Sequence, residues 1–215
     1  MKAVLFDNDG VLADTEGLYY QACRDALRAH GMELSSAEYK EISLRRGEST
    51  IDFAADGRLS AEALRGLKDE RDQIYLGLLN KEAEPREGIR ELLATLHGRF
   101  AMAVVTAAHR AHFDAIHRRT GLAHYFDFVL TQEDCPISKP NPAPYLMALK
   151  RGGWKAADCV VVEDTERGLA SAKAAGIRCY VVPCGPSVGG TFKGAERVCA
   201  DLADLRNELA SSRED

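Results

Sequence analysis

The chain has 215 residues, of which 46% are hydrophobic and 28% charged, and 28 basic against 33 acidic side chains give a net charge of −5. This composition excludes an intrinsically disordered, collagen-like or coiled-coil protein, and the length suits one large domain or one domain with an insert. The mildly acidic balance gives no sign of a nucleic-acid or membrane surface, and the longest apolar runs are too short to span a bilayer.

The first residues and the cysteines indicate a cytoplasmic protein. The N-terminal apolar run reaches an acid at Asp7, which does not match a secretory signal peptide. Six cysteines are scattered without a Cys-x-x-Cys pair, and Cys159 and Cys179 fall within strand-like runs. Because a chain of this length needs no disulfides to fold, we expect reduced thiols that mostly fill the core.

Five short apolar runs without polar alternation predict strands that are buried on both faces of a parallel sheet. In chain order they are residues 3–6, 101–105, 126–130, 159–162 and 179–182. Helical patterns separate the later runs: one follows Pro85, which suits a first helical turn, another begins near Pro144, and an Ala-rich helix is ended by Gly176. Strands that alternate with helices predict an α/β protein with a doubly wound parallel sheet.

One segment after the first strand breaks this alternation. Residues 15–82 contain only helical periodicity, and Ser60 is placed to cap one of the helices. We therefore predict a core made of residues 1–14 and 83–215, interrupted by an all-helical module.

Polar residues follow the predicted strands, at the edge of the sheet where doubly wound proteins bind ligands. They are Asp7, Asn8, Asp9 and Gly10 after the first strand, Thr106 after the second, Lys139 in the loop after the third, and Glu163 and Asp164 after the fourth. Four carboxylates, one hydroxyl and one amine are thus expected to converge on one edge of the sheet.

Such a cluster is suited to phosphoryl transfer. Two carboxylates about 4 Å apart repel by roughly 4 kcal/mol at an effective dielectric constant of 20, and a hard divalent cation such as Mg²⁺ offsets this repulsion. One carboxylate can attack phosphorus, and a second carboxyl two positions on can protonate the leaving oxygen and then deprotonate water. Thr106 and Lys139 can hold the phosphoryl oxygens as their charge redistributes.

Each of these residues also has a simpler structural interpretation. The two aspartates before Gly10 suit a turn, the threonine a helix N-cap, the lysine an exposed surface, and the Glu-Asp pair the cap of the Ala-rich helix. The simpler interpretations require four coincidences, each at the end of a strand. The functional interpretation is therefore favoured.

The motifs together resemble the haloacid dehalogenase superfamily, in the phosphatase and phosphomutase branch that carries a helical cap after the first motif. The resemblance covers nearly the whole chain and rests on Asp7-Asn8-Asp9-Gly10-Val11-Leu12, Thr106, Lys139-Pro140 and Glu163-Asp164-Thr165-x-x-Gly168. It implies a phosphate intermediate on Asp7, with Asp9 as the general acid and base. It also identifies residues 15–82 as the cap.

The same resemblance implies the ligands of the metal and of the phosphate. Mg²⁺ would be held by the Asp7 side chain, the Asp9 backbone carbonyl and Asp164, with Glu163 at or just outside the metal shell. The phosphate would be held by Thr106, Lys139 and the backbone amides of Asn8 and Ala107. Asn8 departs from the apolar residue often found at its position, which should matter little if only its backbone acts.

The expected activity is hydrolysis of a small phosphorylated metabolite, of the phosphosugar or phosphoglycolate type. A β-phosphoglucomutase-like phosphosugar mutase is the alternative, although Tyr19 stands where those enzymes have a cap-hinge histidine. A phospho-receiver signalling domain shares the acidic pocket, but the helical insert and Asp9 count against it.

Two further groups of residues are weighed for a role in binding. Arg45 and Arg46 are candidate contacts for the leaving group, with solvent exposure as the simpler alternative. His109, His112 and His117 lie three to five positions apart, but no nearby motif supports a metal site, so we expect them on a helix surface.

Overall fold

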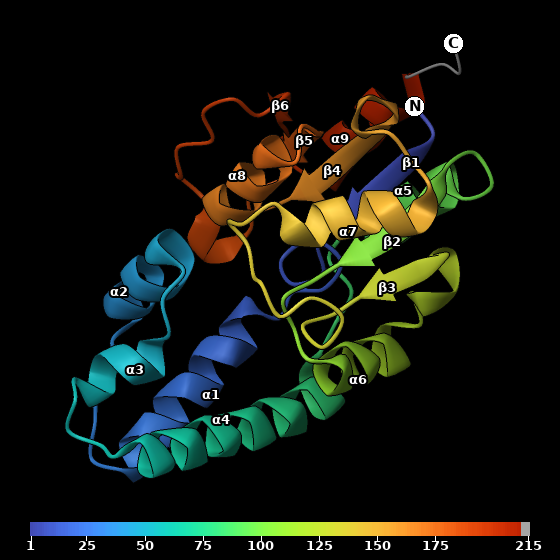
Figure 1. The fold of residues 1–215 in the computed structure, drawn as a ribbon. Helices are drawn as coiled ribbons and strands as arrows, with labels where there is room; N and C mark the ends of the chain where they lie inside the picture. The colour runs from blue at the N-terminus through green and yellow to red at the C-terminus, as the bar shows by residue number, and fades with distance from the viewer. Residues whose placement is uncertain (212–215) are drawn as a thin grey trace.

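The computed structural model describes residues 1–211 and contains a six-stranded parallel sheet (Figure 1). The strands are β1 (Ala3–Phe6), β2 (Ala101–Val105), β3 (Phe128–Leu130), β4 (Cys159–Glu163), β5 (Arg178–Val181) and β6 (Arg197–Val198). Their order across the sheet is β3-β2-β1-β4-β5-β6, and every neighbouring pair is parallel. The predicted doubly wound α/β fold is confirmed.

The central strand β1 is buried on both faces because helices cover the sheet on both sides. Val4 and Phe6 belong to one hydrophobic cluster, whereas Ala3 and Leu5 belong to a second. The first cluster includes side chains of α5 (Ile89–Leu96) and α9 (Leu202–Ser211), and the second includes side chains of α7 (Ala143–Gly152) and α8 (Glu166–Ala174). This alternation follows from the two-residue period of a strand.

Between β1 and β2 the chain forms a group of helices, which we call the helical insert. It comprises α1 (Glu16–Ala29), α2 (Ser36–Tyr39), a π-helical stretch (Lys40–Arg46), α3 (Thr50–Ala55) and α4 (Ala61–Glu82). The Ser60 side chain caps α4 by accepting a hydrogen bond from the Ala63 amide, as predicted. In Figure 1 the insert lies beyond the arrowheads of the strands, so it faces the carboxyl edge of the sheet.

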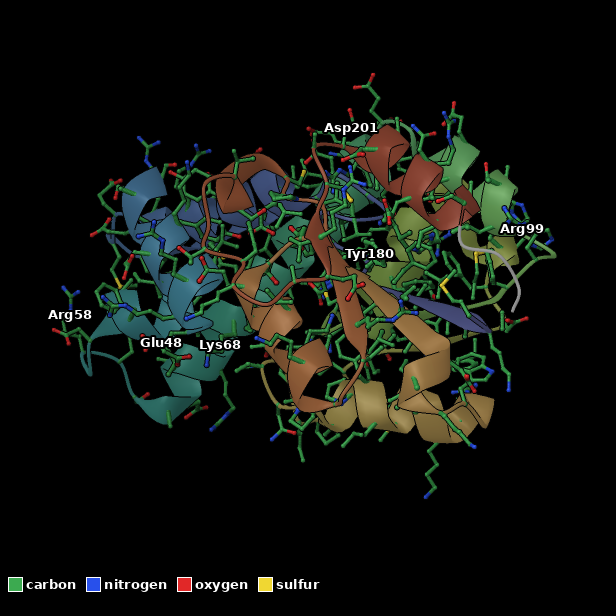
Figure 2. All side chains as sticks on the ribbon, turned by 90° about the horizontal axis from the view of Figure 1, so that it is seen from above. Glu48, Arg58, Lys68, Arg99, Tyr180 and Asp201 are labelled. Carbon is green, nitrogen blue, oxygen red and sulfur yellow. The ribbon has the colours of Figure 1, made fainter. Side chains whose placement is uncertain are left out.

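The insert and the far end of the sheet are well separated along the molecule. Figure 2 shows Glu48, Arg58 and Lys68 on the insert, Tyr180 over the sheet, and Arg99 at the opposite end. Helix α6 (Arg110–Thr120) contacts α4 and joins the insert to the sheet. Short 3₁₀ turns at Ala123–Tyr125, Ala156–Asp158 and Gly185–Ser187 complete the chain path.

Some of the predicted elements differ from those observed. Pro85 is not in a first helical turn, because α5 begins only at Ile89 and Pro85 forms a β-bridge with Ala13. The two-residue strand β6 and helix α9 were not predicted. Strand β6 is exposed and so has no apolar run to mark it.

The cysteines and the helices give two further facts about the described residues. All six cysteines are free thiols, five of them buried and Cys184 half-buried. No helix within residues 1–211 combines the length and the apolar character that crossing a membrane requires.

Candidate active site

The parallel register of the sheet brings the ends of three strands together. Phe6 of β1 pairs with Val104 of β2 on one side and with Val162 of β4 on the other. The residues that follow these positions therefore emerge side by side at the carboxyl edge. Asp7, Thr106, Glu163 and Asp164 all line one cavity there, together with Asp9 and Lys139.

Lys139 is the buried cation of this cluster. Its Nζ lies 2.6 Å from Asp7 Oδ1, 2.7 Å from Glu163 Oε1 and 2.8 Å from the Val105 carbonyl oxygen, and it donates a hydrogen bond to each. Burial alone would lower the pKa of Lys139, but the two carboxylates outweigh it and hold the pKa above its ordinary value. Lys139 therefore stays charged and fixes the Asp7 carboxylate.

Glu163 is fully buried, and donors surround its carboxylate. Oε1 accepts from Lys139 and from the Tyr145 hydroxyl at 2.7 Å, while Oε2 accepts from the Asp164 amide and the Thr165 hydroxyl, both at 3.3 Å. Although burial opposes ionisation, Lys139 and these donors keep the pKa of Glu163 below its ordinary value.

Gly168 is required for this arrangement. A Cβ at that position would lie only 1.9–2.0 Å from the Glu163 carboxyl group. The Thr165 side chain caps α8 by accepting from the Gly168 amide, so the Glu-Asp-Thr-x-x-Gly motif both starts the helix and seats the glutamate.

Asp164 lacks the partners that Glu163 has. Its Oδ1 is the one buried side-chain oxygen or nitrogen among the described residues that has no hydrogen-bond partner. Burial, together with the negative charges of Asp7 and Glu163, raises the pKa of Asp164 well above its ordinary value. Burial also raises the pKa of Asp7, to about 7. The site thus carries more buried carboxylate than its single lysine can neutralise.

A divalent cation would neutralise the excess negative charge of these buried carboxylates. Ligand oxygens of Asp7, Glu163 and Asp164 lie within 4.8 Å of one another. Gly10, at φ +79°, leaves room beside them, since a Cβ there would lie 2.2 Å from Asp164 Oδ2. Hard cations such as Mg²⁺ take carboxylate oxygens, and the unpartnered Asp164 Oδ1 is a donor atom of the right kind.

The Asp9 carboxylate lies apart from this acidic cluster and accepts hydrogen bonds from three directions. Oδ1 accepts from the Thr15 hydroxyl at 2.5 Å and from the Tyr75 hydroxyl at 3.1 Å, and Oδ2 accepts from Asn8 Nδ2 at 3.1 Å. Tyr75 belongs to α4, so a side chain of the helical insert directly contacts Asp9.

Thr106 and Ala107 also line the cavity, as Lys139 does. Thr106 is buried, and its Oγ1 accepts from the Ala108 amide at 3.0 Å, which holds the turn after β2 in place.

The cavity has a volume of about 340 Å³ and extends from the carboxylates to the helical insert. Its outer part is lined by ionisable and aromatic side chains that the sequence did not single out, among them Glu16, Tyr39, Glu48, Arg71, Asp72 and Arg167. Burial raises the pKa of Glu16 to about 7, and the Tyr39 hydroxyl donates a hydrogen bond to it. Arg71 donates to the Tyr19 hydroxyl at 2.6 Å and to Asp72 at 2.8 Å.

Arg45 and Arg46 do not line this cavity. Their side chains are 69% and 48% exposed and pair with Glu41 at 3.3 and 3.2 Å. The π-helical stretch turns them toward solvent, while Gly47 approaches Arg167, with a Cβ there 2.9 Å from the Arg167 side chain. The simpler alternative, solvent exposure, describes both arginines.

The expectation that His109, His112 and His117 lie on a helix surface is wrong for the last two, which belong to α6. His112 and His117 are buried, because α6 packs against α4 and its Phe113 belongs to the hydrophobic cluster that contains Phe6 of β1 and Val104 of β2. His112 packs edge-on against Tyr75 with 4.9 Å between ring centroids, and His117 packs against Phe113 at 4.1 Å. His109 is partly exposed and contacts Glu133. The spacing of His117 from Phe113 and Thr120 placed it on the buried face of the helix.

These features describe an α/β protein with an acidic site built around paired aspartates and a buried lysine at the edge of its sheet, facing a helical insert. The family model described as "Haloacid dehalogenase-like hydrolase" matches residues 4–182. The chain belongs to the haloacid dehalogenase-like hydrolase family, and the resemblance stated from its motifs is confirmed.

The relatives include phosphatases, and solved structures include closely similar folds. A fructose-1-phosphate phosphatase, YqaB, from Escherichia coli K12 is 30% identical over 81% of this chain and 92% of its own length. A phosphorylated carbohydrates phosphatase from Thermotoga maritima is 31% identical, over 82% of each chain. The structure of a CbbY mutant from Rhodobacter sphaeroides with xylulose-1,5-bisphosphate has a TM-score of 0.83 and 26% identity, and covers 95% of this chain and 96% of that one. The protein is a phosphoric monoester hydrolase.

Proposed function

We propose that this protein is a Mg²⁺-dependent phosphatase that hydrolyses small sugar phosphates through an aspartyl-phosphate intermediate, an acyl phosphate, on Asp7. The observation that carries the proposal is the Asp7 carboxylate, held by Lys139 beside the unpartnered oxygen of Asp164 at the floor of the cavity. Asp9 lies two residues further on, where a carboxyl group can reach the leaving oxygen.

In the first step an Asp7 carboxylate oxygen attacks phosphorus, and the bond from phosphorus to the ester oxygen breaks. Protonated Asp9 gives its proton to that oxygen, so the alcohol leaves neutral. In the second step Asp9 takes a proton from water, which attacks the phosphoryl group and releases Asp7 as a carboxylate. Lys139, Thr106 and the backbone amides of Asn8 and Ala107 hold the phosphoryl oxygens throughout.

Asp7, Asp164 and the Asp9 backbone carbonyl would hold the cation. When bound, Mg²⁺ supplies positive charge that stabilises the phosphoryl oxygens in the transition state. We propose that Glu163 acts at the edge of this shell, because its two oxygens already accept hydrogen bonds from four donors. Its main role is then to hold Lys139 in place.

The outer part of the cavity favours a hydroxyl-rich leaving group. It combines acceptors at Glu16, Glu48 and Asp72 with donors at Arg71 and Arg167, so no single charge dominates. Hydroxyl groups, which both donate and accept, suit such a lining better than the carboxylate of phosphoglycolate does. The names of the two phosphatase relatives, for fructose 1-phosphate and phosphorylated carbohydrates, agree with this class. The six free thiols suit a reducing compartment, and we propose the cytoplasm.

The proposal is tested by measuring phosphate release from a panel of esters with and without Mg²⁺. The panel contains hexose and pentose phosphates, phosphoglycolate and a generic aryl phosphate. We expect Mg²⁺-dependent release, fastest from the sugar phosphates. Release from none of the esters by folded protein would contradict hydrolysis, and interconversion of sugar phosphates primed by a bisphosphate would then identify a mutase.

Thermal unfolding tests the metal site without measuring activity. The pKa of Asp7 is raised to about 7, so the proton-bound carboxyl stabilises the folded state at low pH, and this stabilisation is lost as the pH rises through 7. Because a proton on Asp7 competes with the cation, added Mg²⁺ should raise the Tm only slightly at about pH 5.5. At about pH 8, with Mg²⁺ at about a hundred times its Kd at that pH, the Tm should rise by roughly 5 °C. Equal increments at both pH values, or an unchanged increment in Asp164→Asn, would argue against this site.

A further inference from the structure

Asn8 stands between Asp7 and Asp9 in the sequence, and its side chain is completely buried. A buried amide that leaves either end unpaired destabilises the fold, so both ends need partners. Here Nδ2 lies 3.1 Å from Asp9 Oδ2, and Oδ1 lies 2.8 Å from Nε2 of His117. The residue that departs from the apolar pattern of the family thus connects Asp9 to a buried histidine.

The direction of these hydrogen bonds follows from the chemistry of the partners. The Asn8 amide NH₂ donates to Asp9 Oδ2, so the Asn8 side-chain oxygen, which can only accept, faces His117. The ring nitrogen Nε2 must then carry the hydrogen and donate. Burial lowers the pKa of His117 to about 4, so near neutral pH the ring carries a single hydrogen and Nδ1 is an acceptor.

The other ring nitrogen completes the connection. The hydroxyl of Thr120, which is also buried, lies 3.3 Å from Nδ1 and donates to it. Hydrogen bonds therefore run in one direction from Thr120 through His117 and Asn8 to Asp9. We call these four side chains the Asn8 relay.

Aromatic packing holds the relay rigid. The His117 ring lies against the Phe113 ring, with 4.1 Å between their centroids. It also packs in a T-shaped arrangement with the Phe126 ring, with 6.4 Å between centroids. On the other side of Asp9, Thr15 and Tyr75 donate to Oδ1, the oxygen that the relay leaves free. The relay therefore fixes the rotation of the Asp9 carboxylate from the core side, while the insert contacts it from the other.

We propose that Asn8, backed by His117, is a positioning residue that orients the general acid Asp9 toward the leaving oxygen. This role rests on the proposed phosphatase function. Protonation matters most when the leaving oxygen is a strong base, as in a sugar alkoxide, and little when it is a weak base, as in p-nitrophenolate. A misplaced Asp9 should therefore slow the two kinds of ester unequally.

The test compares Asn8→Leu with wild type on a hexose phosphate and on p-nitrophenyl phosphate. Because kcat/KM covers the steps from substrate binding to phosphoryl transfer, it includes the acid role of Asp9 and excludes its later role as a base. We expect kcat/KM to fall by about 10²-fold for the hexose phosphate and by less than about threefold for the aryl ester. Equal losses on both esters, in a variant that unfolds cooperatively, would mean that Asn8 is only structural.

A matched pair at His117 separates the hydrogen bond from the packing. His117→Gln keeps an N–H donor near Asn8 Oδ1, whereas His117→Leu removes it at similar volume. The glutamine variant should retain most of the hexose phosphate activity, and the leucine variant should resemble Asn8→Leu. If the leucine variant is as active on the sugar ester as the glutamine variant, the hydrogen bond from His117 to Asn8 is not needed to orient Asp9.

A spectroscopic measurement keeps the relay separate from the proposed function. Long-range ¹H–¹⁵N spectra of the wild-type protein should show His117 as the Nε2–H tautomer, with a changed Nε2 shift in Asn8→Leu. The Nδ1–H tautomer would overturn the relay. A wild-type protein that shows the expected tautomer but hydrolyses neither ester would instead overturn the phosphatase proposal, and with it the catalytic role of Asn8.

Discussion

Replacing Asp7 by asparagine is expected to abolish phosphate release, with a loss of at least about 10⁴-fold in kcat, because the variant has no carboxylate oxygen to form the bond to phosphorus. The substitution preserves the size of the side chain, and Lys139 keeps its contacts with Glu163 and the Val105 carbonyl. The fold should therefore survive. The measurement is phosphate release with the best sugar phosphate of the panel, with and without Mg²⁺.

Asp14→Asn is the matched control for that loss. Asp14 belongs to the same loop after β1, but it is exposed and does not line the cavity. The control removes one acid from the loop without touching the site, and its activity should stay within about twofold of wild type. An Asp7→Asn enzyme with more than a few per cent of wild-type activity would eliminate Asp7 as the nucleophile.

Replacing Lys139 by methionine should cost both activity and stability. Methionine resembles the lysine stem in shape but removes the only cation between Asp7 and Glu163, which then repel each other in a buried site. Removal of one partner from a buried ion pair typically destabilises a protein by about 3–5 kcal/mol. We expect a loss of this size in the free energy of unfolding from urea titration without divalent cations.

Two controls identify the source of the Lys139 effect. Lys150→Met changes an exposed lysine on α7 and should alter the free energy of unfolding by less than about 0.5 kcal/mol. Adding Glu163→Gln to Lys139→Met removes one of the repelling charges and should restore part of the lost stability. If Lys139→Met loses under about 1 kcal/mol, Lys139 does not neutralise the two carboxylates in the way its contacts indicate.

The helical insert contributes to the site in two ways. It supplies Tyr75, which donates to Asp9, and it supplies Arg71 and Glu48 to the outer cavity. The same helices thus contact both Asp9, the proposed acid and base, and the region where we expect the leaving group to bind. Movement of the insert would therefore change both together, which links substrate binding to the orientation of Asp9.

The order of polar residues after the strands was readable from the chain, because a two-sided parallel sheet leaves a continuous apolar run for each central strand. Such runs mark the ends of β1, β2 and β4: Asp7 and Thr106 follow their strands directly, and Glu163 is the last residue of β4. The parallel register then brings these residues together at one edge of the sheet, independently of the loop conformations. The sheet, the helical insert and the acidic edge were predictable for this reason.

What only the tertiary structure decided is which distant side chains complete the site. Tyr75 reaches Asp9 across 66 positions and His117 reaches Asn8 across 109, and no local pattern encodes either contact. Arg45 and Arg46 look like binding residues in sequence as much as Arg71 and Arg167 do. The folded chain nevertheless exposes the first pair, whereas Arg71 of α4 and Arg167 of α8 line the cavity. Strand ends are set by local burial over a few residues. The hydrogen-bond partners of a side chain and its exposure to solvent depend instead on how whole helices pack, which is fixed only when the chain is folded.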